Sequence, residues 1–218
     1  MDEKEKKLLM LAMFNRHIKI KKIFFQNHID RLERLIALED LKLEYGEIVA
    51  KAKIGREFED YELDNYIEDR ENLKNFEDLI REQMFVSICG YFEYALRRLL
   101  NELDQYKYKP LEISERVLFK IKELEIIDES TFNTFDEYNT IRNACVHLDS
   151  VSPKVNRRMK NASKFGSSIK GFKLKHIDSN KQREGAGRVQ IEKDIFLSNA
   201  LEFHFKIIPE VSEYVRNK

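Results

Sequence analysis

Apolar residues recur at steps of three and four in the middle of this chain, and this spacing constrains the fold more than any other feature. Their positions are Ile80, Met84, Ile88, Tyr91, Ala95, Leu99 and Leu103. Steps of three and four place side chains on one face of an α-helix. With only 7 Gly and 3 Pro in 218 residues, the chain is also poor in the turn formers that β-sandwiches and barrels need. The sequence therefore predicts a mainly all-α protein with this helix at its centre.

The same spacing predicts a long helix on the N-terminal side of the central one. This helix is expected to be amphipathic from about residue 3 to 39 and to fray or break near Gly46. The region 56–72 is dense in Asp and Glu and is expected to be an acidic connection. Pro110 should end the central helix, because proline cannot continue a helix interior.

Three further helices are predicted on the C-terminal side. A short helix is expected at about 114–124, and a second one at about 128–148, with Ser130 or Thr131 as its N-cap. A closing helix is expected at about 194–214. Together with the central helix, these segments predict a helical bundle.

Positive charge is concentrated in one segment, although the whole chain is neutral with 39 basic and 39 acidic side chains. Residues 151–194 contain 12 Lys and Arg against 4 Asp and Glu, whereas residues 1–150 contain 24 against 32. Such a segment is typical of a surface that meets phosphate groups. A solvated basic loop is the alternative. The candidate RNA-binding residues are Lys154, Arg157, Arg158, Lys173, Lys175, Arg183 and Arg188.

The basic segment also differs from the rest of the chain in its turn residues. It contains four of the seven glycines, which bracket two runs of alternating apolar and polar residues at 172–177 and 188–191. This alternation predicts a small β-hairpin. We therefore expect a single domain, 1–218. Its parts are a core at about 75–150 plus 194–216, an N-terminal helical extension at 1–55 and a basic insertion at 153–193.

Several protein classes are excluded by what the sequence lacks. The longest apolar run, Leu8 to Phe14, is too short to cross a membrane, and the acidic N-terminus does not suit a secretory signal. We therefore expect a cytoplasmic protein with no membrane segment. Cys89 and Cys145 lack CxxC spacing and are expected to be buried free thiols. No motif for a metal, a dinucleotide or a serine nucleophile is present, so no metal and no cofactor are expected.

The candidate active site lies in the stretch Ile-Arg-Asn-Ala-Cys-Val-His at 141–147. If this stretch is helical, one apolar stripe should face the core. That stripe comprises Phe135, Tyr138, Ile141, Cys145 and Leu148. Arg142 and His147 then bracket the opposite face, with Asn143 and Val146 between them. A polar face of this kind fits a cleft or a symmetric subunit contact.

Arginine, asparagine and histidine together suit attack of a ribose 2′-hydroxyl on the neighbouring phosphate. His147 can remove or return a proton near neutral pH, and Arg142 can stabilise the extra negative charge of a pentavalent phosphorane. Asn143 can hold a ligand oxygen or orient the imidazole. This route needs no metal. In the structural alternative, Arg142 pairs with an acid such as Glu93, and His147 is a helix C-terminal histidine stabilised by the helix dipole.

An all-helical chain with Arg-Asn-x-x-x-His near the end of a late helix resembles the HEPN domain superfamily, whose nucleases share an Arg-x(4–6)-His motif. The segment from Phe85 to Leu103 looks like the HEPN helix that packs beside the motif helix, and Glu93 best matches the polar residue that joins the site in many members. The likeness covers roughly residues 75–150 plus the closing helix. The long N-terminal helix and the basic insertion depart from the smallest members. The resemblance implies a homodimer with both motifs facing one cleft.

Three hypotheses follow. In the first, the chain is a metal-independent endoribonuclease acting on RNA, with Arg142, Asn143, His147 and Glu93 as catalytic residues. The resemblance further implies a prokaryotic toxin or antiviral effector, with an antitoxin or another protein as a partner. In the second, it is a non-catalytic HEPN module that dimerises and binds nucleic acid, a nucleotide or a protein. In the third, it is a helical scaffold with an accidental likeness. The expected dimer surface is the face of the motif residues together with Val146 and Phe132.

Overall fold

The computed structural model describes residues 2–54, 60–101, 115–146, 169, 171–176, 187–191 and 193–217. Most of these residues are helical, as the spacing of apolar residues predicted. The helices are α1 (Glu3–Ile54), α2 (Asp60–Asn101), α3 (Glu115–Glu123), α4 (Glu129–Val146) and α6 (Lys193–Arg216). Two strands, β1 (Phe172–His176) and β2 (Gly187–Ile191), pair antiparallel. No described helix is both long enough and apolar enough to span a membrane.

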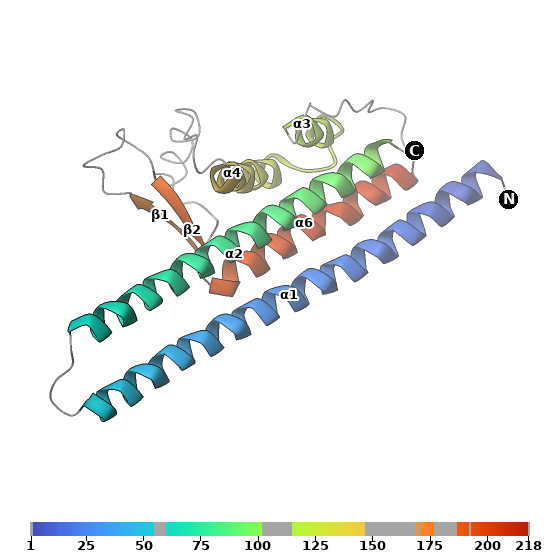
Figure 1. The fold of residues 1–218 in the computed structure, drawn as a ribbon. Coiled ribbons are helices and arrows are strands. Elements are labelled where there is room, and N and C mark those ends of the chain that lie inside the picture. The colour runs from blue at the N-terminus through green and yellow to red at the C-terminus, as the bar shows by residue number, and fades with distance from the viewer. Residues whose placement is uncertain are drawn as a thin grey trace.

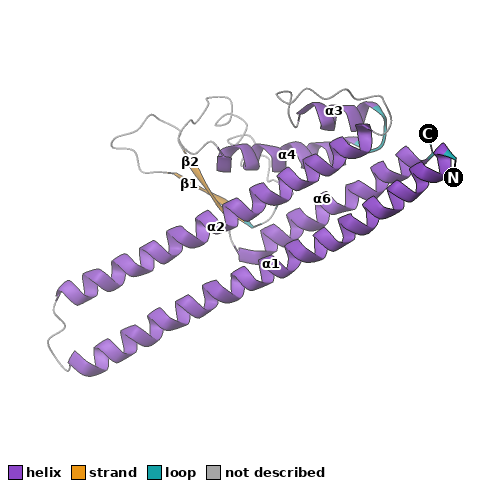
Figure 2. Ribbon diagram, turned by 45° about the vertical axis from the view of Figure 1, so that its right-hand side comes forward, coloured by secondary structure: helices purple, strands orange, loops and turns teal. Residues whose placement is uncertain are grey.

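Three long helices form the body of the molecule. Helix α6 packs against both α1 and α2, and α1 runs antiparallel to the other two (Figure 1). Helices α3 and α4 lie on the side of the α2–α6 pair that faces away from α1, and β1 and β2 lie beside the first turns of α6 (Figure 2). Both α1 and α2 extend beyond the start of α6. The layer that α2 and α6 form therefore separates α1 from α4, the helix that carries Arg142.

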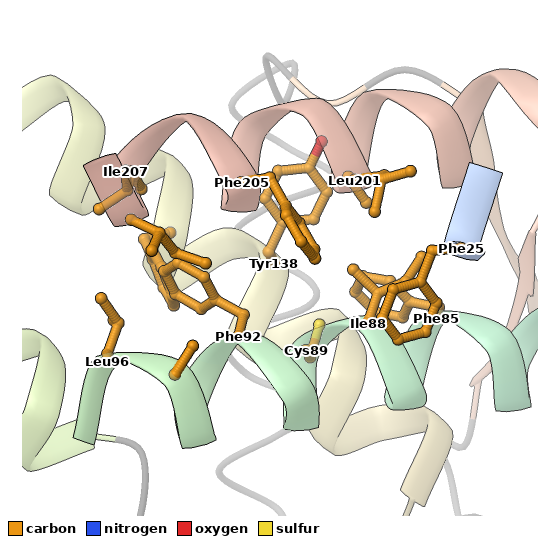
Figure 3. Close-up of a cluster of buried hydrophobic side chains, with 14 of the residues drawn as sticks. Phe25, Phe85, Ile88, Cys89, Phe92, Leu96, Tyr138, Leu201, Phe205 and Ile207 are labelled. Carbon is orange, nitrogen blue, oxygen red and sulfur yellow. The ribbon is translucent and has the colours of Figure 1, made fainter. Parts of the chain in front are cut away.

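The core lies where α2, α4 and α6 meet, and aromatic rings fill it (Figure 3). Phe85 and Phe92 of α2 are at most 1% exposed. The ring of Phe85 packs edge-on against Phe196 of α6, with ring centroids 4.9 Å apart, and Phe92 lies 5.0 Å from Phe135 of α4. Burial of large apolar side chains supplies the main driving force for folding. The central helix predicted from the spacing between Ile80 and Leu103 therefore has the role in the core that this spacing indicated.

Helix α1 begins with a reciprocal cap and continues without a break. The Glu5 amide donates to Asp2 Oδ1 at 2.6 Å, and the Asp2 amide donates to Glu5 Oε2 at 2.9 Å, as in a capping box. The predicted break at Gly46 is wrong, because α1 runs through it to Ile54. Glycine inside a helix costs only about 1 kcal/mol relative to alanine. The buried stripe of α1 comprises Leu11, Phe14, Ile18, Phe25, Ile29, Leu32 and Ile36.

The predicted acidic connection at 56–72 is also wrong from residue 60 onward, because α2 already begins at Asp60. Its Glu residues are good helix formers, so the density of charge marked a helix rather than a loop. Arg81 of α2 then ties the two long helices together. Its guanidinium bonds to Glu33 of α1 at 2.8 Å and to Glu77 of α2 at 3.2 Å, with only 8% of its side chain exposed.

A tight turn leads the chain from α3 into α4. Glu125 adopts a left-handed conformation with φ of 55°, and the Ile126 amide donates to the Ile121 carbonyl at 3.1 Å. This bond from the residue after the left-handed one closes a Schellman cap, which satisfies the last carbonyls of a helix. The turn buries Ile127 and brings the chain directly to the first residue of α4. The predicted end of α2 at Pro110 lies outside the described residues.

Candidate functional site

Helix α4 carries Arg142 and Asn143 of the motif, and its first turn is fixed by a side-chain cap. Asp128 Oδ1 accepts a hydrogen bond of 2.7 Å from the Thr131 amide, so Asp128 is the N-cap and the predicted caps, Ser130 and Thr131, are wrong. The hydrogen bonds from Thr131 lower the pKa of the Asp128 carboxyl. A negative charge at this position also suits the helix dipole. The cap sets the register of the residues that follow on α4.

The apolar stripe predicted for this helix faces the core. Phe135, Tyr138, Ile141 and Cys145 are all buried, while Leu148 lies outside the described residues. Two polar residues, Asn139 and Thr140, are buried as well, which the stripe did not predict. They are buried because α2, α3 and β2 all pack on α4 and cover more than one face of it. Thr140 satisfies its hydroxyl by donating to the Asp136 carbonyl at 2.8 Å.

The predicted residues Arg142, Asn143 and Glu93 form one polar cluster between α4 and α2. Arg142 Nη1 donates to Asn143 Oδ1 at 2.7 Å, and Arg142 Nη2 donates to Glu93 Oε2 at 3.2 Å. Arg97, one turn further along α2, binds the other oxygen of Glu93. The side chains of Arg142 and Glu93 are 17% and 13% exposed, so the pair is largely shielded from water. The structural alternative predicted this pairing of Arg142 with Glu93, and the catalytic hypothesis placed Glu93 at the same site.

A pocket adjoins this cluster. The pocket opens to solvent, and its enclosed part has a volume of about 20 Å³, room for about one water molecule. Glu93, Asn139 and Arg142 form its polar wall. The other lining residues are Cys89, Phe92, Leu96, Val117, Leu118, Phe135 and His204. Arg142, Arg97 and Glu93 together sum to one positive charge beside a mainly apolar hollow, an arrangement that favours an anionic group such as a phosphate.

His204 is a site residue that sequence reasoning missed. It is 1% exposed, its Nδ1 donates to the Ala200 carbonyl at 2.6 Å, and its Nε2 lies 3.7 Å from Cys89 Sγ. Burial lowers the pKa of His204 to about 4, and burial raises the pKa of the Cys89 thiol far above its ordinary range. Both groups are therefore neutral at pH 7. The steps of three and four that link Leu197, Ala200 and His204 could have predicted the burial of this histidine.

The neutral, buried His204 predicts a specific loss of stability in acid. Its pKa is lower in the folded protein than the ordinary 6.5, so the unfolded chain binds the proton more readily. The loss of unfolding free energy caused by this difference is absent above pH 6.5 and grows as the pH falls. It levels off below pH 4 at about 3 kcal/mol. Urea unfolding at several pH values should show a shallower decline between pH 7 and 4 in His204→Gln. An unchanged decline in this variant contradicts the prediction.

The predicted surface around the motif is only partly open. Val146 is 49% exposed, but Phe132 packs on α3, with its ring centroid 5.3 Å from Phe119 and Lys122 Nζ 4.3 Å above it. Phe132 is therefore engaged within its own chain, which corrects its assignment to an open face. His147 follows Val146 in the sequence and lies outside the described residues, as do Lys154, Arg157, Arg158 and Arg183.

The remaining candidate RNA-binding residues lie on the strand pair. In the antiparallel register, Lys175 pairs with Arg188 and Lys173 with Gln190, whereas Phe172 pairs with Ile191. Because side chains alternate between faces along a strand, the three basic positions share one face. The other face includes Ile191, which is fully buried. Gly171, with φ of 93°, brings the start of β1 so close to α6 that an added Cβ would lie 3.0 Å from Phe196 Cβ.

Among the described residues, no three His, Cys, Asp or Glu side chains come together as a group able to hold a metal ion. Comparison of the chain with protein-family models, with curated proteins and with solved structures finds no match. The interpretation of the site therefore rests on its own geometry and on the sequence motif.

Proposed function

We propose that this chain is a metal-independent endoribonuclease of the HEPN type, which cleaves RNA by attack of a ribose 2′-hydroxyl on the neighbouring phosphate. The observation that carries the proposal is the cluster of Arg142, Asn143 and Glu93, which joins the motif helix to α2 beside an open pocket. Arg142 is the proposed phosphate ligand. His147 is the proposed general acid and base.

The geometry of Arg142 supports this role. Asn143 and Glu93 hold two of its guanidinium nitrogens, so the planar fork is oriented before a substrate arrives. A preorganised donor stabilises developing charge without reorganising during the reaction. Glu93 also binds Arg97, so this carboxylate is held by a second cation while it orients Arg142. We assign Glu93 and Asn143 as positioning residues for Arg142.

The strand pair supports RNA as the substrate. In the register of the two strands, the positions of Lys173, Lys175 and Arg188 alternate with those of Phe172 and Ile191, so three basic residues gather on one face of a short strand pair. Neutralised phosphates release condensed counterions, which makes binding depend steeply on salt. The proposed role of this basic face is affinity for the RNA backbone, separate from the chemistry at Arg142.

Replacing Lys173, Lys175 and Arg188 with glutamine is expected to weaken RNA binding and to flatten its salt dependence. With a slope of about −0.7 per contact with single-stranded RNA, the log–log slope should fall by about 2. The single-turnover rate at saturating RNA should stay nearly unchanged. Fluorescence anisotropy over a range of salt concentrations measures the slope. The matched control changes Lys42, Lys74 and Lys206 to glutamine, which removes the same charge elsewhere on the surface. Equal effects in the two variants contradict a role for the strand pair.

The direct test of the proposed function is incubation of the purified protein with total RNA in EDTA. We expect cleavage, with 2′,3′-cyclic phosphate ends, because the proposed route uses only side chains for proton transfer and charge stabilisation. RNA that is bound but left intact would favour the non-catalytic module. RNA that is neither bound nor cut would favour the helical scaffold.

The proposed biological role follows from the resemblance alone. HEPN ribonucleases include prokaryotic toxins and antiviral effectors, so expression of the chain in bacteria is expected to slow growth. His147→Ala should relieve this effect. Equal toxicity of the two proteins would disconnect the effect from the proposed chemistry.

A further inference from the structure

Helix α1 carries a second row of residues beside its buried stripe. The row follows alternating steps of three and four from Met10 to Ile48, and every member is exposed. Its first arm is Met10, Met13, His17, Ile20 and Phe24. Its second arm is Leu38, Leu41, Tyr45 and Ile48. Between the arms lie Asn27, Arg31 and Arg34. We call this row the α1 seam.

The α1 seam has the spacing of a coiled-coil contact and is unusually apolar for a surface. Met13 is 65% exposed, Leu41 59% and Tyr45 70%. Repeats of seven residues with apolar first and fourth positions pack against a second helix in the same way. The buried stripe of α1 already packs against α2 and α6, so the seam is not needed for packing within the chain. Contiguous exposed apolar surface of this kind marks an interaction site.

Charge along α1 is divided between the two arms. Residues 6–29 contain six Lys and Arg and no Asp or Glu. Residues 37–48 contain four Asp and Glu and one Lys. A helix with this distribution attracts an antiparallel copy of itself, because each basic arm then meets an acidic arm. A parallel copy would instead place like charges side by side.

The seam is also complementary to itself in this orientation. With a two-fold axis near Ile29, Ile20 lies opposite Leu38 of the second copy, and Met13 lies opposite its Tyr45. First positions of the repeat meet fourth positions along the whole row, as antiparallel coiled coils require. Arg16 and Glu44 flank the seam on its open side, both are exposed, and each faces the other residue type across the axis.

We propose that α1 binds α1 of a second copy of this chain, antiparallel, along the α1 seam. The seam spans about 57 Å at 1.5 Å per residue, enough to bury roughly 800 Å² on each partner, the usual size of a specific interface. The middle of the row favours this register. Asn27 then lies opposite Arg31 of the second copy, and Arg34 lies opposite its Phe24. A slip of one repeat would instead set Asn27 against Leu38 or Phe24, which leaves its amide facing an apolar side chain.

This surface differs from the motif face on which the sequence placed a dimer. Helix α1 and helix α4 lie on opposite sides of the α2–α6 layer (Figure 1). The α1 seam therefore leaves the side of the molecule that carries α4 and Arg142 uncovered. The inference stands whether or not the chain cleaves RNA.

Analytical ultracentrifugation of the full chain at tens of micromolar tests the proposal. We expect a dimer, and we expect Ile20→Glu with Leu38→Glu to raise its dissociation constant about a hundredfold or more. The matched control is Ile195→Glu on α6, since Ile20 and Ile195 are both 54% exposed. Circular dichroism confirms that all variants are folded. A monomeric wild type, or a double variant that dimerises as tightly as the control, overturns the proposal.

Charge reversal tests the antiparallel orientation. Arg16→Glu alone and Glu44→Arg alone each set like charges against one another and should weaken the dimer, whereas the double variant should restore it. Loss without restoration overturns the proposed orientation.

Cross-linking tests the register. Single variants Ile20→Cys and Leu38→Cys should form a disulfide-linked dimer only when the two proteins are mixed and oxidised, because Cys89 and Cys145 are buried. A cross-link within Leu38→Cys alone indicates a parallel pair and overturns the register.

Discussion

Replacing Arg142 with alanine is expected to lower the single-turnover rate of RNA cleavage in EDTA by at least ~10², because a preorganised charge donor contributes that much to phosphoryl chemistry. His147→Ala should have an effect of similar size, since general acid–base groups contribute about 10² to 10⁴. The fold should survive the loss of Arg142, because Arg97 remains bound to the Glu93 carboxylate. Urea unfolding of each variant measures that stability separately from activity.

Two further variants separate a catalytic role from a structural one. Arg142→Lys keeps the charge but loses the planar fork, so its rate should stay close to that of the alanine variant. Arg98→Ala removes an exposed arginine of α2 and should cleave as the wild type does. Full activity in Arg142→Ala would contradict a catalytic role for Arg142. Its role would then be structural, through the ion pair with Glu93.

Replacing Arg81 with methionine is expected to cause the largest loss of stability, about 3–5 kcal/mol at pH 7, as breaking a buried ion pair does. Methionine keeps much of the side-chain volume, but it leaves the carboxylates of Glu33 and Glu77 facing each other with no guanidinium between them. The control is Lys22→Met, because Lys22 and Glu202 form an exposed pair across α1 and α6. Exposed pairs contribute about 0–1 kcal/mol. Urea denaturation of the two variants gives the comparison.

The loss of unfolding free energy in Arg81→Met, relative to the wild type, should be smaller at acidic pH. Burial already raises the pKa of Glu77 in the intact protein, and removal of Arg81 takes away the cation that opposes this shift. A carboxyl with a raised pKa disfavours folding once it ionises, so protonation below its folded pKa relieves the variant. The difference in unfolding free energy between wild type and variant should therefore be smaller at pH 4.5 than at pH 7. A constant difference over this range contradicts the assignment of Arg81 as the partner of these carboxylates.

The helices were predictable from sequence where one face is buried and less so where a helix is exposed. The spacing of the buried residues Ile88, Ala95 and Leu99 predicted α2. The errors fell at Gly46 and at 60–72, on segments of α1 and α2 that lie beyond the start of α6. No α1 residue described after Ile36 is buried. In these segments glycine and clustered charge were the remaining signals, and a helix tolerates both.

The candidate site was predictable in part for the same reason. Arg142 was found from the motif spacing and the helical phase, and Glu93 from the resemblance and as the acid of the structural alternative; the structure brings the two together. His204 and Asn139 were missed because they are polar residues on mainly apolar faces. Their burial depends on which elements pack against α4 and α6. The residue spacing within one helix does not show these neighbours. The contribution of His147 stays a prediction.

The central position of α6 has a consequence for how the protein is made. Asn15 of α1 donates a hydrogen bond of 2.9 Å to Ser212 of α6, 197 residues later in the sequence. At a synthesis rate of 5–20 residues per second, α1 is synthesised about 10 to 40 seconds before the segment of α6 that it packs against. Throughout that interval its apolar stripe has no α6 to cover it. The nascent chain is therefore expected to engage chaperones early, and to fold only when its last helix emerges.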